Sequence, residues 1–420
     1  MLNKWSASAV AILLALGFAS GTYAGATEKV LYTFPAGSIH PDSGLVHDSA
    51  GNLYGELQFG GEGFGVVYRL SPDEKRKGAW AYSVIYTFTG QNDGAFPAGA
   101  LTIDSAGNLY GSASGGGSPT DNNGVIFELS PDKNGNWSET RTYHFTGAPD
   151  GAHPESGVVL DAAGNVLGAA HSGGLGDDGI GGYGTLFKLT PSGDHAWKET
   201  TIHRFSAGTD GNNPSTRLAL DRQGNLYGTL QYGGKNGLGY IYRFHESKNR
   251  WTGADLHDFG DNDRDQTYSG VTLDRRGNVY GTTIFNNGTS WAGSVFELAE
   301  PSGSERSKEN TWPMTTLYTF AGDADGGVPQ GLTFDALGNL YGAAAQGGAN
   351  GQGEIYKLTP SANGGPTIWT KSVLYDFLGG NDGCAPGWDL TFDKPVSKQL
   401  YGATGTCGAN GTGLLYSVKN

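Results

Sequence analysis

Short apolar runs separated by glycine-rich turns recur along nearly the whole chain. In one example, Leu101–Ile103 is followed by Asp104 and a turn, and the next apolar run begins at Leu109. Runs this short, with apolar side chains at alternate positions, are typical of β-strands. No stretch keeps the period of an amphipathic helix over a useful length. The pattern therefore predicts an all-β protein.

The apolar runs belong to a unit that occurs seven times, with starts 53 to 61 residues apart. Each unit predicts four short strands, and the second strand carries a Leu-Tyr-Gly pattern. The fourth strand ends in a phenylalanine: Phe34, Phe88, Phe145, Phe205, Phe259, Phe320 and Phe377. Four antiparallel strands repeated around an axis are the design of a β-propeller. The sequence therefore predicts a single seven-bladed propeller over residues 26–420.

The two ends of the chain predict how the ring closes. The propeller begins with a lone fourth strand, Val30–Phe34, and ends with a third strand, Leu414–Val418, that has no fourth strand after it. We expect the N-terminal strand to complete the last blade, because pairing the two ends covers two exposed strand edges.

The string Asp-x-x-Gly-Asn-Leu-Tyr-Gly, followed by Gly-Gly and then Gly-x-Val/Ile-Phe/Tyr-x-Leu-x-Pro, resembles the GloVer-type tandem repeat family of exported bacterial proteins. The resemblance implies a β-propeller and export. It implies no established activity, so no catalytic residue is carried over. The third unit departs from the pattern with Leu167 in place of tyrosine, and the seventh lacks Gly-Asn before Leu400.

Residues 1–25 have the composition of a signal peptide, with an apolar core over Ala9–Ala19. Without Lys4 the chain has 26 basic and 41 acidic residues, a net charge of −15. This charge disfavours nucleic acid as a partner, and no later stretch is apolar enough to span a membrane. A periplasmic or secreted location is expected. In an oxidising compartment, Cys384 and Cys407 are expected to form a disulfide.

Side chains that depart from the repeat are candidates for function. Six tryptophans lie eight residues before the closing phenylalanine of their unit, which indicates packing: Trp80, Trp137, Trp197, Trp251, Trp312 and Trp369. Trp291 and Trp388 break this pattern. Both are expected in loops on one face of the ring, near the mouth of the central channel, where flat rings can stack on sugars. The alternative is that each only anchors its own loop.

Charged and polar side chains also break columns of the repeat near the mouth. Arg217 and Asp389 occupy a first-strand column that is otherwise small: Gly44, Ala100, Gly157, Gly270 and Gly331. They are expected to point into the channel, either as a structural ion pair or to orient a ligand. Gln58, His171 and Gln231 lie at the mouth end of second strands, and His153 in a neighbouring loop, and they are further candidates to bind a ligand.

These residues favour a protein that binds an extracellular ligand, and a polysaccharide is the ligand class that they indicate. One alternative is a lyase in which His153 or His171 acts as a base beside Arg217, or a hydrolase that uses Asp389 and Glu155. A protein-interaction scaffold is another. The sequence leaves open whether the protein is an enzyme. No cofactor is predicted, although the loops at Asp323–Asp325 and Asp261–Asp263 have side chains that suit calcium.

Overall fold

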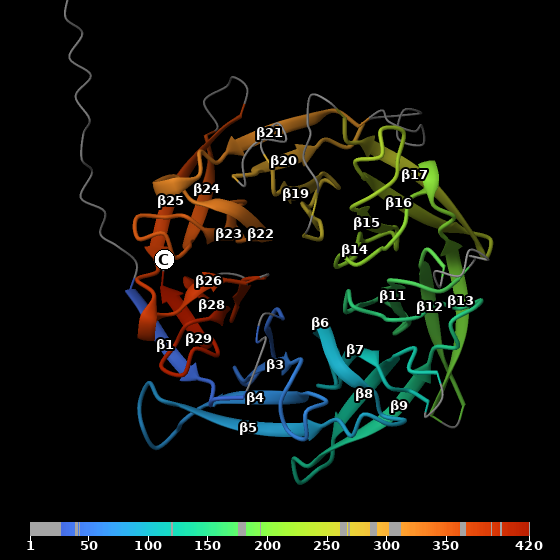
Figure 1. Cartoon of the computed structure of the whole chain (residues 1–420), viewed down its shortest axis with the longest axis horizontal. Coiled ribbons are helices and arrows are strands. Elements are labelled where there is room, and N and C mark those ends of the chain that lie inside the picture. Colours follow the sequence, from blue (N-terminus) through green and yellow to red (C-terminus); the bar gives the residue numbers. More distant parts are fainter. Residues whose placement is uncertain are drawn as a thin grey trace, which may run out of the picture.

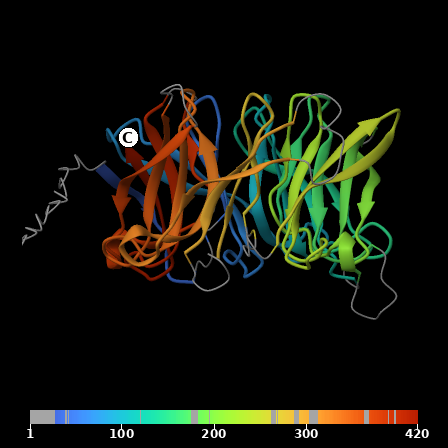
Figure 2. The ribbon, with the colours of Figure 1, turned by 90° about the horizontal axis from the view of Figure 1, so that it is seen from above.

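The computed structural model describes residues 27–37, 41, 43–118, 121–174, 182–193, 195–260, 267, 269–285, 292–301, 312–361, 367–387, 389–394 and 397–419. Seven antiparallel sheets surround a central axis, as Figure 1 shows, so the predicted seven-bladed β-propeller is confirmed. Seen edge-on in Figure 2, the strands run between two faces on which the loops gather. The predicted signal peptide lies outside the described residues.

Each blade is built from strands that are consecutive in the sequence, except the seventh. The blades are β2 (Val46–His47), β3 (Leu53–Leu57), β4 (Val66–Pro72), β5 (Trp80–Thr87); β6 (Ala95–Ile103), β7 (Leu109–Gly115), β8 (Val125–Pro131), β9 (Trp137–His144); β10 (Val158–Leu160), β11 (Val166–Ala170), β12 (Thr185–Ser192), β13 (Ala196–Arg204); β14 (Ala219–Leu220), β15 (Leu226–Leu230), β16 (Tyr240–Ser247), β17 (Arg250–Asp258); β18 (Thr272–Leu273), β19 (Val279–Thr283), β20 (Ser294–Leu298), β21 (Met314–Thr319); β22 (Gly327–Phe334), β23 (Leu340–Gln346), β24 (Glu354–Ser361), β25 (Ile368–Asp376); and β26 (Cys384–Pro386), β27 (Thr391–Phe392), β28 (Gln399–Thr406), β29 (Leu414–Lys419) with β1 (Thr27–Thr33).

Helical structure is limited to single turns in the described part of the chain. These turns are 3-10 helices in fourth-to-first loops: η1 (Gly208–Asp210), η3 (Asp323–Asp325) and η4 (Gly380–Asp382). No helix that the structure describes has the length and apolar character needed to cross a lipid bilayer.

The turn between the first and second strands explains why its aspartate recurs. In the second blade, Asp104 Oδ1 accepts hydrogen bonds from the backbone N–H groups of Ala106 (2.8 Å) and Asn108 (2.9 Å). Its other oxygen accepts from the Asn108 amide and the Tyr110 hydroxyl. The aspartate therefore fixes the turn and also binds the tyrosine of the Leu-Tyr-Gly pattern.

The hydrophobic core lies between neighbouring sheets. One cluster, for example, joins Tyr54 and Val67 of the first blade to Leu101 and Phe127 of the second. The repeated tryptophans cross the same junctions. Five of these tryptophans stack edge-on against the second-strand tyrosine of the preceding blade. The pairs are Tyr54–Trp137, Tyr110–Trp197, Tyr227–Trp312, Tyr280–Trp369 and Tyr401–Trp80. The packing role predicted for these tryptophans is therefore confirmed.

The ring closes as the sequence predicts. β1 pairs antiparallel with β29, from Thr27 opposite Lys419 to Thr33 opposite Leu414, and Figure 1 shows these two strands side by side. The strand is longer at its N-terminal end than the predicted Val30–Phe34. The Phe34 carbonyl also accepts hydrogen bonds from the side chains of Asn410 and Thr412, each at 2.8 Å.

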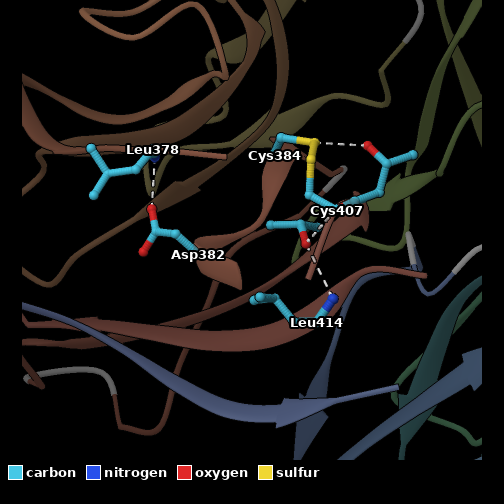
Figure 3. Close-up of a disulfide and its surroundings, with 7 residues drawn as sticks. Leu378, Asp382, Cys384, Cys407 and Leu414 are labelled. Carbon is cyan, nitrogen blue, oxygen red and sulfur yellow. Dashed lines mark hydrogen bonds between the residues drawn. A yellow bond between two sulfur atoms is a disulfide. The ribbon is translucent and has the colours of Figure 1, made fainter. Parts of the chain in front are cut away.

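The predicted disulfide is present in the closing blade. Cys384 of β26 and Cys407, just after β28, are bonded to each other, with Cα atoms 5.5 Å apart. Figure 3 shows the bridge beside Asp382, which holds the preceding turn through the Leu378 backbone N–H. The bridge therefore joins the fourth-to-first loop of this blade to its second-to-third loop.

Candidate functional site

A cavity of about 370 Å³ lies at the mouth end of the central channel. Its wall is formed near the beginnings of first strands and the ends of second strands. Most of the wall is small or backbone, and the larger polar side chains are few. The lining residues are Ser43, Gly44, Glu56, Gln58, Pro97, Ala98, Gly99, Ala100, Glu155, Ser156, Ser215, Arg217, Ser269, Gly270, Gly331 and Asp389. We call this space the mouth cavity.

Arg217 and Asp389 form an ion pair across the channel. The Arg217 Nη1 donates to Asp389 Oδ2 at 2.7 Å. The two residues precede β14 and β27, in the fourth and seventh blades, which are separated by two blades on one side of the ring and three on the other. Glycines at the same column make room for them, because a Cβ atom at Gly44 would lie 3.0 Å from the Asp389 Cβ.

The ion pair also forms the floor of the mouth cavity. A second space of about 340 Å³ lies further along the channel, and its wall includes Arg217, Gly270 and Asp389 as well. The rest of its wall consists of first-strand residues, many with apolar side chains, such as Leu218 and Leu390. The pair therefore lies between the mouth cavity and this second space.

The other predicted residues divide between the cavity wall and its surroundings. Gln58 lines the cavity. His171 lies behind Glu155, with its Nδ1 3.7 Å from Glu155 Oε2, and only the carboxylate of this pair faces the cavity. Gln231 is not part of the wall, so the structure does not bring it together with the others.

His153 is also outside the cavity wall. Its backbone has a φ of 54° and its Nδ1 lies 2.8 Å from the Ser172 hydroxyl. Positive φ at this position is a feature of the repeat, since residues of four other blades share it: Phe96, Asn213, Val328 and Ala385. The histidine therefore occupies a structural turn, held by Ser172 of its own blade and by a backbone hydrogen bond to Asn123 of the second blade.

Glu56 is a cavity residue that the sequence analysis missed. Its side chain is 1% exposed, and neither carboxyl oxygen has a hydrogen-bond partner among the described residues. Burial raises the pKa of this carboxyl well above its usual value. In the same second-strand column the other blades have small side chains: Ser112, Ala169, Thr229, Thr282, Ala343 and Ala403. A comparison of this column between the seven units would therefore have identified Glu56 from the sequence.

The repeat itself identifies the protein's family. Two overlapping stretches, residues 19–181 and 140–312, match the model of the Gloeobacter/Verrucomicrobia repeat. Together they span residues 19–312, well over half of the chain. The chain belongs to this repeat family. The resemblance seen in the sequence is therefore confirmed.

Comparisons outside the Gloeobacter/Verrucomicrobia repeat family are distant. No curated protein matches the chain. One solved structure that matches is a gluconolactonase from Xanthomonas campestris, with 14% sequence identity. The alignment covers 83% of this chain and 90% of that chain, with a TM-score of 0.42. A likeness this low carries no argument about what the repeat-family chain binds.

The two tryptophans that were predicted to stack on a ligand are not among the residues that the structure describes. Trp291 and Trp388 both lie outside the described residues. Trp388 directly precedes Asp389 in the sequence, and Gly387 on its other side is bonded through its backbone to Ala403. Their role in stacking on a ligand stays a prediction.

The calcium hypothesis also stays a prediction, although the structure explains one of its aspartates. Asp325 accepts hydrogen bonds from the Tyr318 hydroxyl and the Ala321 backbone, and it pairs with Lys371 at 3.0 Å. Aspartates of four other blades hold the same turn: Asp93, Asp150, Asp210 and Asp382. No group of three or more potential metal ligands occurs among the described residues, and the Asp261–Asp263 loop lies outside them.

Proposed function

We propose that this protein is exported and binds an extracellular polysaccharide, one part of which enters the mouth cavity. The observation that carries this proposal is the convergence of side chains that break the repeat. Gln58, Glu155, Arg217 and Asp389 come from four different blades and face one space. Its volume of about 370 Å³ is in the range of small-ligand sites. Membership of the repeat family and the disulfide support export.

The chemistry of the wall suits a sugar. A sugar hydroxyl both donates and accepts hydrogen bonds, and the Gln58 amide can do both in return. The Glu155 carboxylate accepts from two neighbouring hydroxyls, while the glycines of the wall leave room for a ring. Trp291 and Trp388 are proposed to stack on further sugar units outside the cavity.

A glycoside hydrolase is the second candidate, favoured by Glu56 and Glu155 in one wall. Hydrolysis needs one carboxyl that holds a proton and one that is ionised, and the burial of Glu56 keeps its proton bound. A lyase is less well supported. It needs a free cation for the substrate carboxylate, and Arg217 is already bonded to Asp389.

The proposal is tested by incubating the pure protein with a panel of soluble polysaccharides and measuring both retention and product release. We expect retention of at least one polymer, and its loss in Gln58→Ala. The matched control is Gln223→Ala, which removes the same side chain from an exposed turn at the opposite end of a first strand. Equal retention by the two variants would reject the mouth cavity as the site. A copurifying protein with no glycan retention would instead favour a scaffold.

A further inference from the structure

The wall of the mouth cavity has more acidic than basic side chains, and this imbalance favours a sugar of one charge over another. This inference rests on the proposed function. Among the described residues of the wall, Arg217 is the one cation, against the three carboxyl groups of Glu56, Glu155 and Asp389. The whole mature chain has the same bias, with a net charge of −15 once Lys4 is removed with the predicted signal peptide.

The charge of the single cation is already paired with a carboxylate. Arg217 donates to Asp389 at 2.7 Å, so the two charges neutralise each other in the cavity floor. A uronate carboxylate that bound Arg217 would lie close to the Asp389 carboxylate, and the repulsion between the two like charges disfavours it. The pair therefore discriminates against acidic sugars.

The remaining carboxyls lack donors. Glu155 has His171 at 3.7 Å, too far for a hydrogen bond between the two side chains. Both oxygens of Glu56 are without a hydrogen-bond partner among the described residues, although this side chain is almost completely buried. Glu155 is 43% exposed, so its carboxylate is open to a ligand. The buried oxygens of Glu56 without donors are unfavourable, so a ligand that brings donors improves this part of the wall.

We propose that the sugar unit bound in the mouth cavity carries a primary ammonium group, as in a polymer of glucosamine, and that Glu155 is its main contact. An ammonium group has three hydrogen-bond donors and no acceptor, which matches a wall whose carboxyl groups offer acceptors without donors. Its positive charge strengthens each hydrogen bond to a carboxylate. Glu56 lies in the same wall, but its burial favours the protonated form, so Glu155 provides most of the negative charge.

Isothermal titration with two matched oligosaccharides tests this proposal. The first is a hexamer of glucosamine and the second a hexamer of N-acetylglucosamine, which has the same length without the charge. We expect the glucosamine hexamer to bind about 10-fold more tightly at low salt, the effect of one charge-assisted contact. The preference falls as salt rises, because ions screen the attraction.

Charge-removing variants locate the effect. Glu155→Gln is expected to reduce the preference to about threefold or less, and Glu56→Gln to reduce it by a smaller factor. The control is Glu74→Gln, which removes one negative charge from an exposed residue of the β4–β5 loop, at the other face of the ring. It should leave the preference unchanged. Melting temperatures of all three variants show whether each one folds.

The outcomes separate this inference from the proposed function. Equal binding of the two hexamers, or tighter binding of an oligogalacturonate, would overturn the ammonium proposal. If such a neutral or acidic sugar still lost its binding in Gln58→Ala, the mouth cavity would stand as the binding site. If no saccharide bound, or if Gln58→Ala changed nothing, the proposed function would fail as well.

Discussion

The junctions between blades and the mouth of the channel follow opposite rules. At the junctions, the same tryptophan meets the same tyrosine in one blade after another, and five such pairs are present. At the mouth, positions that are small in most blades hold Glu56, Arg217 or Asp389 in just one or two. Packing between blades keeps the repeated residues the same, whereas the side chains at the mouth differ from blade to blade.

Removing β1 should affect the junctions most. Deleting residues 27–33 takes the outer strand from the seventh blade and exposes the edge of β29. We expect the melting temperature to fall by about 5 to 10 °C, since several kilocalories per mole of burial are lost. A variant that lacks only residues 1–26 is the control and should melt like the full chain. Equal melting of both variants would show that β1 does not close the ring.

A single junction can be broken with Trp312→Ala. This tryptophan is 2% exposed and lies 6.4 Å from the Tyr227 ring, measured between centroids. We expect a loss of about 3 to 5 kcal/mol in the free energy of unfolding, measured with denaturant, because a large buried side chain is removed. Gln58→Ala, at the mouth, should change the same free energy by less than about 1 kcal/mol. Similar losses in both variants would remove the contrast between the two regions.

The junctions should also weaken as the pH rises. Burial, with a contribution from Asp382, raises the pKa of Glu28 to about 7, and burial raises that of Glu139 to about 7 as well. Between the ordinary pKa of 4.5 and about 7, the folded protein keeps protons that the unfolded chain has released. Stability therefore falls as pH rises through this window. Thermal melts from pH 5 to 8 should show the fall, and Glu139→Gln should make it shallower.

The smallest effect on stability is expected from the ion pair at the mouth. The side chains of Arg217 and Asp389 are 40% and 26% exposed, so water screens their attraction. A double-mutant cycle with Arg217→Gly and Asp389→Gly, the residue most blades have here, should give a coupling of about 0.5 to 1 kcal/mol. A coupling of several kilocalories would mean that the pair holds the ring together.

Most of the fold could be predicted because its signals repeat. The blade count, the closing strand and the packing tryptophans each followed from spacings that recur along the sequence. The disulfide followed from two cysteines in a chain that the sequence predicts to be exported. The same sequence pattern occurs in each of the seven units, so the repeat is recognised even though one unit is irregular, such as the third with Leu167.

Less of the candidate site could be predicted from the sequence. The sequence placed Arg217 and Asp389 in one column, but their bond depends on how two distant blades face each other across the ring. Gln231 shares its column with Gln58 and yet does not reach the cavity. Glu56 was overlooked because it stands within a strand whose neighbours are all buried, where a charged residue is costly and not expected.

We propose that the residues that break the repeat form a sugar site in the mouth cavity. A crystal structure of the protein with the tightest-binding oligosaccharide is the decisive test. We predict one sugar unit inside the cavity, within hydrogen-bond distance of Gln58 and Glu155 and above the Arg217–Asp389 pair. A saccharide bound on another surface, with the cavity filled only by water, would contradict the account.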